Sequence, residues 1–329
     1  MSAAEVRLPV EGRMPSLDGA TGWLQSPALT TDGLRGRVVL VDFWTYTCVN
    51  WLRTAPYVRA WAEKYRDQGL VVIGVHTPEF GVEHDIDNVR RAVQDRMLTH
   101  PIALDNDYAI WNAFGNRYWP ALYAVDAQGR IRYHRFGEGD YEESERVVQA
   151  LLAEAGADGV GDDLVSVEAE GPEAAADWSH IGSPETYVGY LRGDNFASPG
   201  GAVPDVPSRY ELPARLGLNH WALSGEWTIG REATVPNQPG ARLACRFYAR
   251  DLNLAMGPAP QGGPVPFRVS LDGQPPGAAA GTDVDGDGRG TVSASQLHQL
   301  IRQPGPVTDR SFEIEFLDRG VEVLVFTFG

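Results

Sequence analysis

The chain has 329 residues, of which 43% are hydrophobic and 22% are charged, and its formal net charge is −16. This composition is typical of a globular protein, the length favours two domains, and the negative charge argues against nucleic acid and anionic membranes as partners. We expect a cytoplasmic protein, because no apolar run reaches the roughly 18–20 residues of a membrane span and no secretory signal opens the sequence.

Residues 1–155 are predicted to alternate strands and helices. The runs 37–44 and 70–76 are apolar and rich in β-branched residues, which is typical of strands buried on both faces of a sheet. In chain order, strands are predicted at 37–44, 70–76, 101–105, 121–126 and 130–136, and helices at 47–65, 84–97, 108–114 and 141–153. This alternation predicts an α/β domain, in which a mixed sheet carries helices on both faces.

Residues 156–177 are expected to form a linker, because they carry seven acidic groups, no basic group and no aromatic residue. From Trp178 onward the helical period is lost, and short strands separated by glycine and proline predict an all-β sandwich or jelly roll over 178–329. Its strands are predicted at 187–191, 219–229, 241–249, 252–256, 266–271, 311–317 and 321–328.

Cysteine is scarce, since Cys48 and Cys245 are the only two in the chain. Two cysteines exclude a disulfide-rich scaffold and a metal site built from cysteine alone. Cys245 shares the apolar face of a predicted strand with Leu243 and Phe247, so we expect a buried structural residue. Cys48 lies where a buried strand passes into a helix, and helix N-terminal N–H groups lower a thiol pKa and favour the nucleophilic thiolate. The alternative for Cys48 is a small buried apolar side chain.

Several segments around Cys48 form a recognisable set. They are Phe-Trp-Thr-Tyr-Thr-Cys-Val-Asn-Trp at 43–51, Pro56, Val-Ile-Gly-Val-His-Thr-Pro-Glu at 72–79, Tyr-Trp-Pro-Ala-Leu-Tyr at 118–123 and Phe-Gly-Glu-Gly-Asp-Tyr at 136–141. Together they resemble the thioredoxin-like domain of the TlpA and DipZ group within the redoxin superfamily. The resemblance continues into the second domain. It implies a thioredoxin-like fold in which Pro120 is a cis proline facing Cys48.

The chain departs from the disulfide oxidoreductases of this group at Trp51, where they carry the second cysteine of Cys-x-x-Cys. In those enzymes the second thiol attacks the mixed disulfide and releases the substrate. The resemblance therefore implies an oxidoreductase that uses Cys48 alone, with an external low-molecular-weight or protein thiol as reductant. Its substrate is a disulfide, in monothiol exchange, or a peroxide, which oxidises the thiolate to sulfenic acid. The alternative is a non-catalytic binding protein with an inactive redoxin domain and a glycan- or protein-binding β-sandwich.

Further candidate residues surround the reactive cysteine. Thr45, which stands in the Thr-x-x-Cys spacing of peroxiredoxins, and Thr47 are expected to stabilise charge together with helix N–H groups. Trp44, Trp51 and Trp119 are expected to form an aromatic wall for substrate, with packing in the core as the alternative.

Two charged residues are weaker candidates for substrate binding. Glu79 follows the second predicted strand and is expected to accept a proton or position water, with a solvated loop acid as the alternative. Arg117 precedes the Pro120 turn and is expected to hold the thiolate or an anionic substrate, with an ordinary surface arginine as the alternative. His76 is expected to be a hydrogen-bonded core histidine. No cofactor is expected, and no spacing of His, Asp and Glu predicts a metal in residues 1–155.

The second domain offers two ligand hypotheses. DipZ-type relatives carry a domain resembling carbohydrate-binding modules, which implies a glycan ligand stacked on aromatic rings. The candidate aromatic residues are Trp221, Trp227, Tyr187 and Tyr190. Separately, Asp283, Asp285 and Asp287 match the first ligands of a calcium loop, but Ala294 stands where the bidentate glutamate belongs. Calcium is therefore an alternative to a solvated acidic turn.

Overall fold

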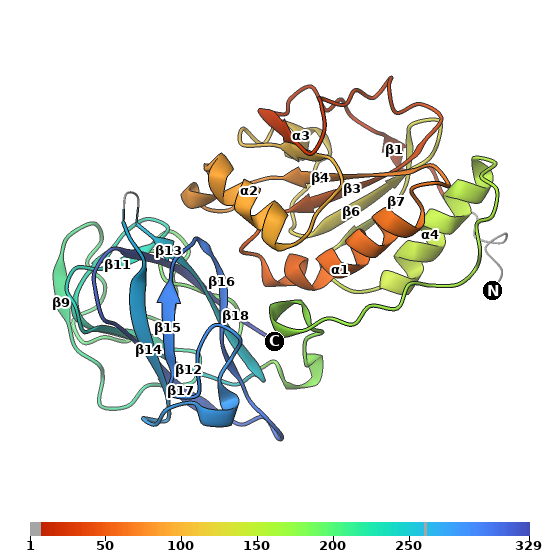
Figure 1. Ribbon diagram of the computed structural model, residues 1–329. Coiled ribbons are helices and arrows are strands. Elements are labelled where there is room, and N and C mark those ends of the chain that lie inside the picture. The colour runs from red at the N-terminus through yellow and green to blue at the C-terminus, as the bar shows by residue number, and fades with distance from the viewer. Residues whose placement is uncertain (1–7, 260–261) are drawn as a thin grey trace. The chain divides into compact units, whose positions relative to one another are not determined.

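The computed structural model describes residues 8–259 and 262–329 (Figure 1). The chain divides into two compact units, unit 1 (Met1–Ala169) and unit 2 (Glu170–Gly329). Within the described ranges, no helix combines the length and the apolar character needed to cross a bilayer.

The described part of unit 1 contains a seven-stranded mixed sheet with the order β1-β7-β6-β3-β4-β5-β2. Its strands are β1 (Gly12–Arg13), β2 (Gly22–Leu24), β3 (Val38–Trp44), β4 (Leu70–His76), β5 (Ile102–Leu104), β6 (Ala121–Val125) and β7 (Arg130–Phe136). The central strand β3 pairs in parallel with β4 and antiparallel with β6. This arrangement confirms the predicted mixed sheet.

Helices cover both faces of this sheet, as the sequence predicts. They are α1 (Val49–Lys64), the 3-10 helix η2 (Gly81–His84), α2 (Ile86–Asp95), α3 (Ala109–Ala113) and α4 (Tyr141–Glu154). On one face, Val58 of α1 and Val148 of α4 share a core with Leu40 of β3. On the other face, Trp111 of α3 shares a core with Val41. Neighbouring residues of β3 enter different cores because strand side chains alternate between the faces.

Two details of unit 1 differ from the prediction. The edge strands β1 and β2 pair with β7 and β5 but are only two and three residues long, too short to show a period in the sequence. The helix predicted at 84–97 is confined to α2, because Asp85 caps it by accepting a hydrogen bond from the Asp87 N–H at 2.9 Å.

A buried carboxylate attaches the segment after α4 to unit 1. Glu145 of α4 accepts hydrogen bonds from Lys64 Nζ at 3.0 Å, from the Tyr65 hydroxyl at 2.6 Å and from the Val165 N–H at 2.9 Å. Val160 and Val165 also pack against the core beneath α1 and α4. Part of the segment expected to be a linker is thus bound to unit 1.

We expect Glu145→Ala to lower the free energy of unfolding of unit 1 by about 2–4 kcal/mol, because a lysine, a tyrosine hydroxyl and a backbone N–H lose their buried acceptor. Urea unfolding measures this loss, with hydrogen exchange in peptides of α4 as the signal that reports the unfolding of unit 1. The control is Glu142→Ala on the same helix, because the Glu142 side chain is 68% exposed and its pair with Arg146 is worth under about 1 kcal/mol. Equal losses of unfolding free energy in the two variants would contradict the stabilising role of Glu145.

Unit 2 is a curled, antiparallel, strand-rich sheet domain whose two halves share strand β10. In its described part the order is β15-β14-β17-β12-β10-β11-β18-β13-β16, with β8 beside β18 and β9 beside β10. The strands are β8 (Thr186–Tyr187), β9 (Ser208–Tyr210), β10 (Trp221–Ile229), β11 (Thr234–Pro236), β12 (Ala241–Phe247), β13 (Asp251–Pro258), β14 (Val265–Leu271), β15 (Arg289–Val292), β16 (Gln296–Arg302), β17 (Arg310–Phe316) and β18 (Val321–Phe328). Short 3-10 helices lie at η3 (Gly171–Glu173), η4 (Trp178–His180) and η5 (Gly277–Ala279). The all-β prediction is confirmed.

Strand β10 changes partners at Gly225. Its residues up to Ser224 pair with β12, and its residues from Gly225 onward pair with β9 and β11. Gly225 has a φ of +93°, and a Cβ there would lie 3.2 Å from Ala241 Cα, so this bend requires glycine.

The two halves of the sheet enclose the core of unit 2. Along β12, the side chains of Leu243, Cys245 and Phe247 all belong to this core. Burial raises the pKa of the Cys245 thiol, which keeps it neutral. Cys245 is therefore a buried apolar side chain of the core.

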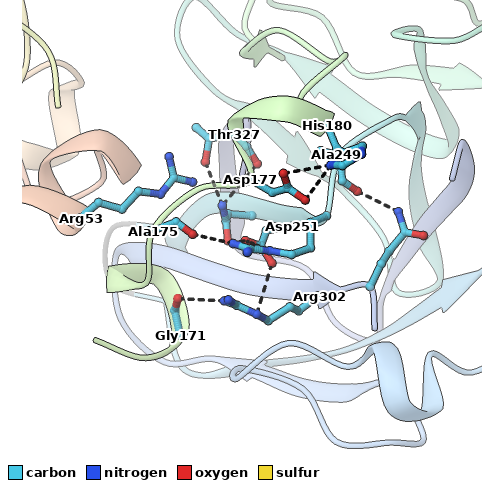
Figure 2. A network of polar contacts seen from close by, with 12 residues as sticks. Arg53, Gly171, Ala175, Asp177, His180, Ala249, Asp251, Arg302 and Thr327 are labelled. Carbon is cyan, nitrogen blue, oxygen red and sulfur yellow. Dashed lines mark hydrogen bonds and ion pairs between the residues drawn. The ribbon is translucent and has the colours of Figure 1, made fainter. Parts of the chain in front are cut away.

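The first residues of unit 2 are attached to its sheet by two arginines (Figure 2). Arg302 donates to the Gly171 carbonyl at 3.3 Å, and Arg250 donates to the Ala175 carbonyl at 2.7 Å. Both guanidinium groups also pair with Asp251 of β13, at 3.7 and 2.7 Å respectively. The charge of Asp251 thereby orients both donors toward the segment 171–175.

Candidate active site

Cys48 occupies the N-cap position of α1. Strand β3 ends at Trp44, and in the turn that follows the Cys48 N–H bonds to the Thr45 carbonyl at 3.3 Å. The Leu52 N–H then donates to the Cys48 carbonyl at 3.0 Å and begins the helical ladder. Residue 48 therefore occupies the position where first-turn N–H groups and the positive end of the helix dipole favour an anion.

The Cys48 sulfur faces the loop that carries Pro120. Its Sγ lies 3.7 Å from the carbonyl oxygen of Trp119, and the Trp119–Pro120 peptide bond is cis. Cys48 thus contacts the residue that precedes a cis proline, and the role of Pro120 at the site stays a prediction. The cysteine is 9% exposed, so most of its surface is covered.

A buried tryptophan occupies position 51. Trp51 is 1% exposed, its ring stacks on Trp44 with 4.4 Å between centroids, and its indole N–H donates to Asp42 Oδ2 at 3.0 Å. A tryptophan packed in the core therefore occupies the position at which Cys-x-x-Cys proteins carry their second thiol. Because Cys245 belongs to unit 2, Cys48 is the only cysteine of unit 1.

Asp42 is a buried carboxyl group beneath the candidate site. Burial raises its pKa to about 7, and the hydrogen bond from Trp51 opposes this shift. Its second oxygen, Oδ1, has no hydrogen-bond partner among the described residues. Asp42 was not among the residues predicted for the site, although a single acid inside the apolar run 37–44 was a usable signal.

The pH dependence of stability tests this buried acid. The folded chain holds the Asp42 proton to a higher pH than the unfolded chain does, so ionisation of Asp42 removes stability as the pH rises from about 4 to about 7. Asp42→Asn keeps an acceptor for Trp51 and cannot ionise. We expect its free energy of unfolding, relative to the unchanged chain, to rise by about 3 kcal/mol between pH 5 and pH 8.

Urea unfolding of both chains at these pH values measures the difference between them. The other titrating groups largely cancel, because both chains contain them. A difference that does not change with pH would contradict the burial of an ionisable Asp42.

A second buried carboxylate, Glu83 of η2, binds the turn before the cysteine. Its Oε1 accepts the Thr47 hydroxyl at 2.6 Å, and its Oε2 accepts the N–H groups of Glu79 at 2.5 Å and Phe80 at 3.0 Å. Burial raises the pKa of Glu83 to about 7, repulsion from Glu79 adds to the shift, and the hydrogen bond from Thr47 opposes it. Glu83 was not among the residues predicted for the site, because no local sequence pattern distinguishes it from other acidic residues.

The predicted site threonines therefore lie next to Glu83. Thr45 and Thr47 are both buried, and the Thr47 hydroxyl proton points to the carboxylate. Their expected role in stabilising charge on the cysteine stays a prediction.

The three tryptophans form two separate groups. Trp44 and Trp51 are buried against each other, so they present no open face to a substrate. Trp119 is partly exposed, packs against Trp111 with 4.2 Å between centroids, and donates its indole N–H to the Thr77 carbonyl at 3.0 Å. Of the expected aromatic wall, Trp119 alone has surface available to a ligand.

The remaining predicted residues of unit 1 take different positions. Glu79 is partly exposed and contributes its backbone N–H to Glu83, and Arg117 is exposed in the loop before Trp119. His76 is buried against the rings of Trp44 and Tyr46, and burial lowers its pKa to about 3. Neither nitrogen of the His76 ring has a hydrogen-bond partner in the described chain, which corrects the expectation of a hydrogen-bonded core histidine.

The candidate sugar-stacking residues of unit 2 divide by burial. Trp221 and Trp227 belong to the core and donate their indole N–H groups to backbone carbonyls at 2.8 and 2.9 Å, so they are not available for stacking. The Tyr187 ring is covered by the Arg192 guanidinium at 3.8 Å. Tyr190 is 39% exposed and donates its hydroxyl to Asp205 at 3.0 Å.

The aspartates of the predicted calcium loop in unit 2 form hydrogen bonds and an ion pair with other residues of the same unit. Asp283 accepts the Gln299 N–H at 2.8 Å, Asp285 accepts the Arg289 N–H at 2.8 Å, and Asp287 pairs with Arg289 at 3.2 Å. Over residues 8–259 and 262–329, no group of three or more His, Cys, Asp or Glu side chains is arranged to hold a metal ion. Calcium binding by this turn stays a prediction.

Two family models match the chain, and each match lies within one unit. The family described as Redoxin matches residues 11–152, and the family described as Thioredoxin like C-terminal domain matches residues 183–329.

Similar proteins cover the chain to different extents. Protein DipZ of Mycobacterium tuberculosis is 37% identical over 269 residues, which are 80% of this chain and 37% of DipZ. The chain thus spans little more than a third of that relative's length. Thiol-disulfide oxidoreductase YkuV of Bacillus subtilis is 31% identical over 141 residues, which are 43% of this chain and 95% of YkuV. A solution structure of a thioredoxin-like protein in the oxidized form is 31% identical, covers 44% of this chain and 96% of its own, and has a TM-score of 0.40.

Proposed function

The chain belongs to the thioredoxin-like redoxin family, in the DipZ-type form with a second β-domain, and on that premise we propose that it is a thiol oxidoreductase with one reactive cysteine, Cys48. The observation that carries the proposal is the pair of residues at the start of α1. Cys48 occupies the N-cap beside the Trp119 carbonyl, whereas buried Trp51 fills the position of the family's second cysteine. Such a site can form a mixed disulfide but needs an external thiol to resolve it.

The proposed reaction is two successive thiol–disulfide exchanges. The Cys48 thiolate attacks one sulfur of a substrate disulfide, a bond from Cys48 to that sulfur forms, and the other half leaves as a thiolate. An external thiolate then attacks the substrate sulfur of the mixed disulfide, which forms a new external disulfide and returns Cys48 as thiolate. The reductant is a low-molecular-weight or protein thiol, and we expect the reaction in the cytoplasm.

Peroxide reduction is the second candidate and uses the same nucleophile. The thiolate would attack a peroxide oxygen, form sulfenic acid and release water or an alcohol, after which two external thiols restore Cys48, release water and become a disulfide. The Thr45-x-x-Cys48 spacing favours this reaction. Disulfide exchange is better supported, because YkuV, which is similar to this chain over 141 residues, is named a thiol-disulfide oxidoreductase.

A coupled turnover assay distinguishes the two reactions. Reduced glutathione is the donor, a peptide–glutathione mixed disulfide or hydrogen peroxide is the oxidant, and glutathione reductase reports the glutathione disulfide that forms. Turnover with the mixed disulfide supports the proposal, and turnover with peroxide alone assigns the second candidate. No turnover with either oxidant would contradict both and favour the non-catalytic binding protein.

A further inference from the structure

Glu83 links two segments that are far apart in the sequence. One is the turn 45–48 that leads from β3 to the candidate nucleophile, and the other is the loop 77–84 that follows β4. Three donors converge on the carboxylate, from the Thr47 hydroxyl, the Glu79 N–H and the Phe80 N–H. With 0% exposure, this side chain is screened from water, so these bonds replace its hydration.

We propose that Glu83 is a positioning residue for Cys48, which holds the turn 45–48 in the conformation that places the sulfur at the N-terminus of α1. The proposal rests on the function proposed above and adds to it a residue outside the cysteine motif.

The bond to Thr47 carries the positioning argument. Thr47 immediately precedes Cys48, and its hydroxyl bond of 2.6 Å to Glu83 ties the turn to the loop after β4. A short hydrogen bond to a charged acceptor is among the stronger ones in proteins. Without this bond, the turn 45–48 is no longer fixed to the loop after β4. The Cys48 sulfur can then move away from the Trp119 carbonyl, from which it lies 3.7 Å.

The charge of Glu83 gives the proposal a second, electrostatic consequence. A carboxylate that is hydrogen-bonded to Thr47, the residue before Cys48, opposes a second negative charge on the sulfur, so ionised Glu83 makes the thiolate harder to form. Among the titratable groups of the same loop, Glu79 repels the Glu83 carboxylate and His84 follows Glu83 directly in the sequence. Because burial raises the pKa of Glu83 to about 7, its charge changes close to neutral pH.

The test is the pH dependence of Cys48 alkylation by iodoacetamide, measured by peptide mass in the full chain. Glu83→Gln keeps an acceptor for the two N–H groups and an amide beside Thr47, but removes the charge. We expect the midpoint of the alkylation profile to move to lower pH by half a unit or more, with disulfide turnover within about threefold of the unchanged chain. The control is Glu63→Gln, which removes one exposed carboxylate from α1 and should leave the midpoint in place.

Glu83→Leu tests the positioning itself. It removes all three acceptor bonds, and we expect turnover to fall at least tenfold, with Glu83→Gln restoring it. Equal midpoints in Glu83→Gln and the unchanged chain, or full turnover in Glu83→Leu, would overturn the proposal. If Glu83→Leu does not fold, the proposal is tested by the midpoint of the Cys48 alkylation profile in Glu83→Gln, compared with that of the unchanged chain. If the unchanged chain shows no turnover, the proposed function fails separately, because the alkylation profile needs no oxidant.

Discussion

Replacing Cys48 with serine is expected to abolish glutathione-dependent turnover, with a loss of at least about a thousandfold. A serine hydroxyl stays protonated at neutral pH and forms no disulfide, and unit 1 contains no other thiol to replace it. The matched control is Cys245→Ala, which removes the other sulfur of the chain. Because Cys245 is buried in the core of unit 2, we expect a cost of about 1 kcal/mol in stability and no loss of turnover.

The coupled assay with a peptide–glutathione mixed disulfide measures both variants. If Cys48→Ser keeps its turnover, or if Cys245→Ala loses it while still folded, Cys48 is not the nucleophile.

The second large effect is expected from Trp51→Cys. Cys48 and position 51 have the spacing of Cys-x-x-Cys at a helix N-terminus, so we expect this variant to close a disulfide when oxidised and to release a bound substrate without an external thiol. It also removes an indole that is 1% exposed and stacked on Trp44. We therefore expect the free energy of unfolding to fall by about 3–5 kcal/mol.

Trp61→Cys is the matched control for Trp51→Cys. Trp61 is a fully buried tryptophan of the same helix, more than three turns from Cys48, so its loss should cost similar stability and close no disulfide. Intact mass after mild oxidation detects the loss of two hydrogens, and urea unfolding measures the stability. If Trp51→Cys keeps both thiols reduced while it is folded, the geometry at position 51 is not that of a resolving cysteine.

Much of the fold was predictable because strand and helix periods are local properties of the sequence. The long strands β3 and β4 are continuous apolar runs, and the helices α1 and α4 bury apolar residues at helical spacing. The short edge strands β1 and β2 do not, because their identity depends on the neighbouring strands with which they pair.

The candidate site was predictable to a smaller extent. Cys48 was placed by its position between a strand and a helix, and Pro120 by resemblance to the family. Glu83 was not predictable, because its bond to Thr47 joins two loops that only the tertiary structure brings together. The burial of Trp44 and Trp51 was also not predictable, since nothing in the sequence distinguishes a tryptophan that lines a groove from one that packs in a core.

The most direct test of the central claim is the intact mass of the full chain after treatment with glutathione disulfide and then with reduced glutathione. We predict one glutathione adduct, located on Cys48 by peptide mapping, which reduced glutathione then removes to restore the original mass. A chain that takes up no glutathione, or that takes it up at Cys245, would contradict a thiol oxidoreductase that works through Cys48 alone.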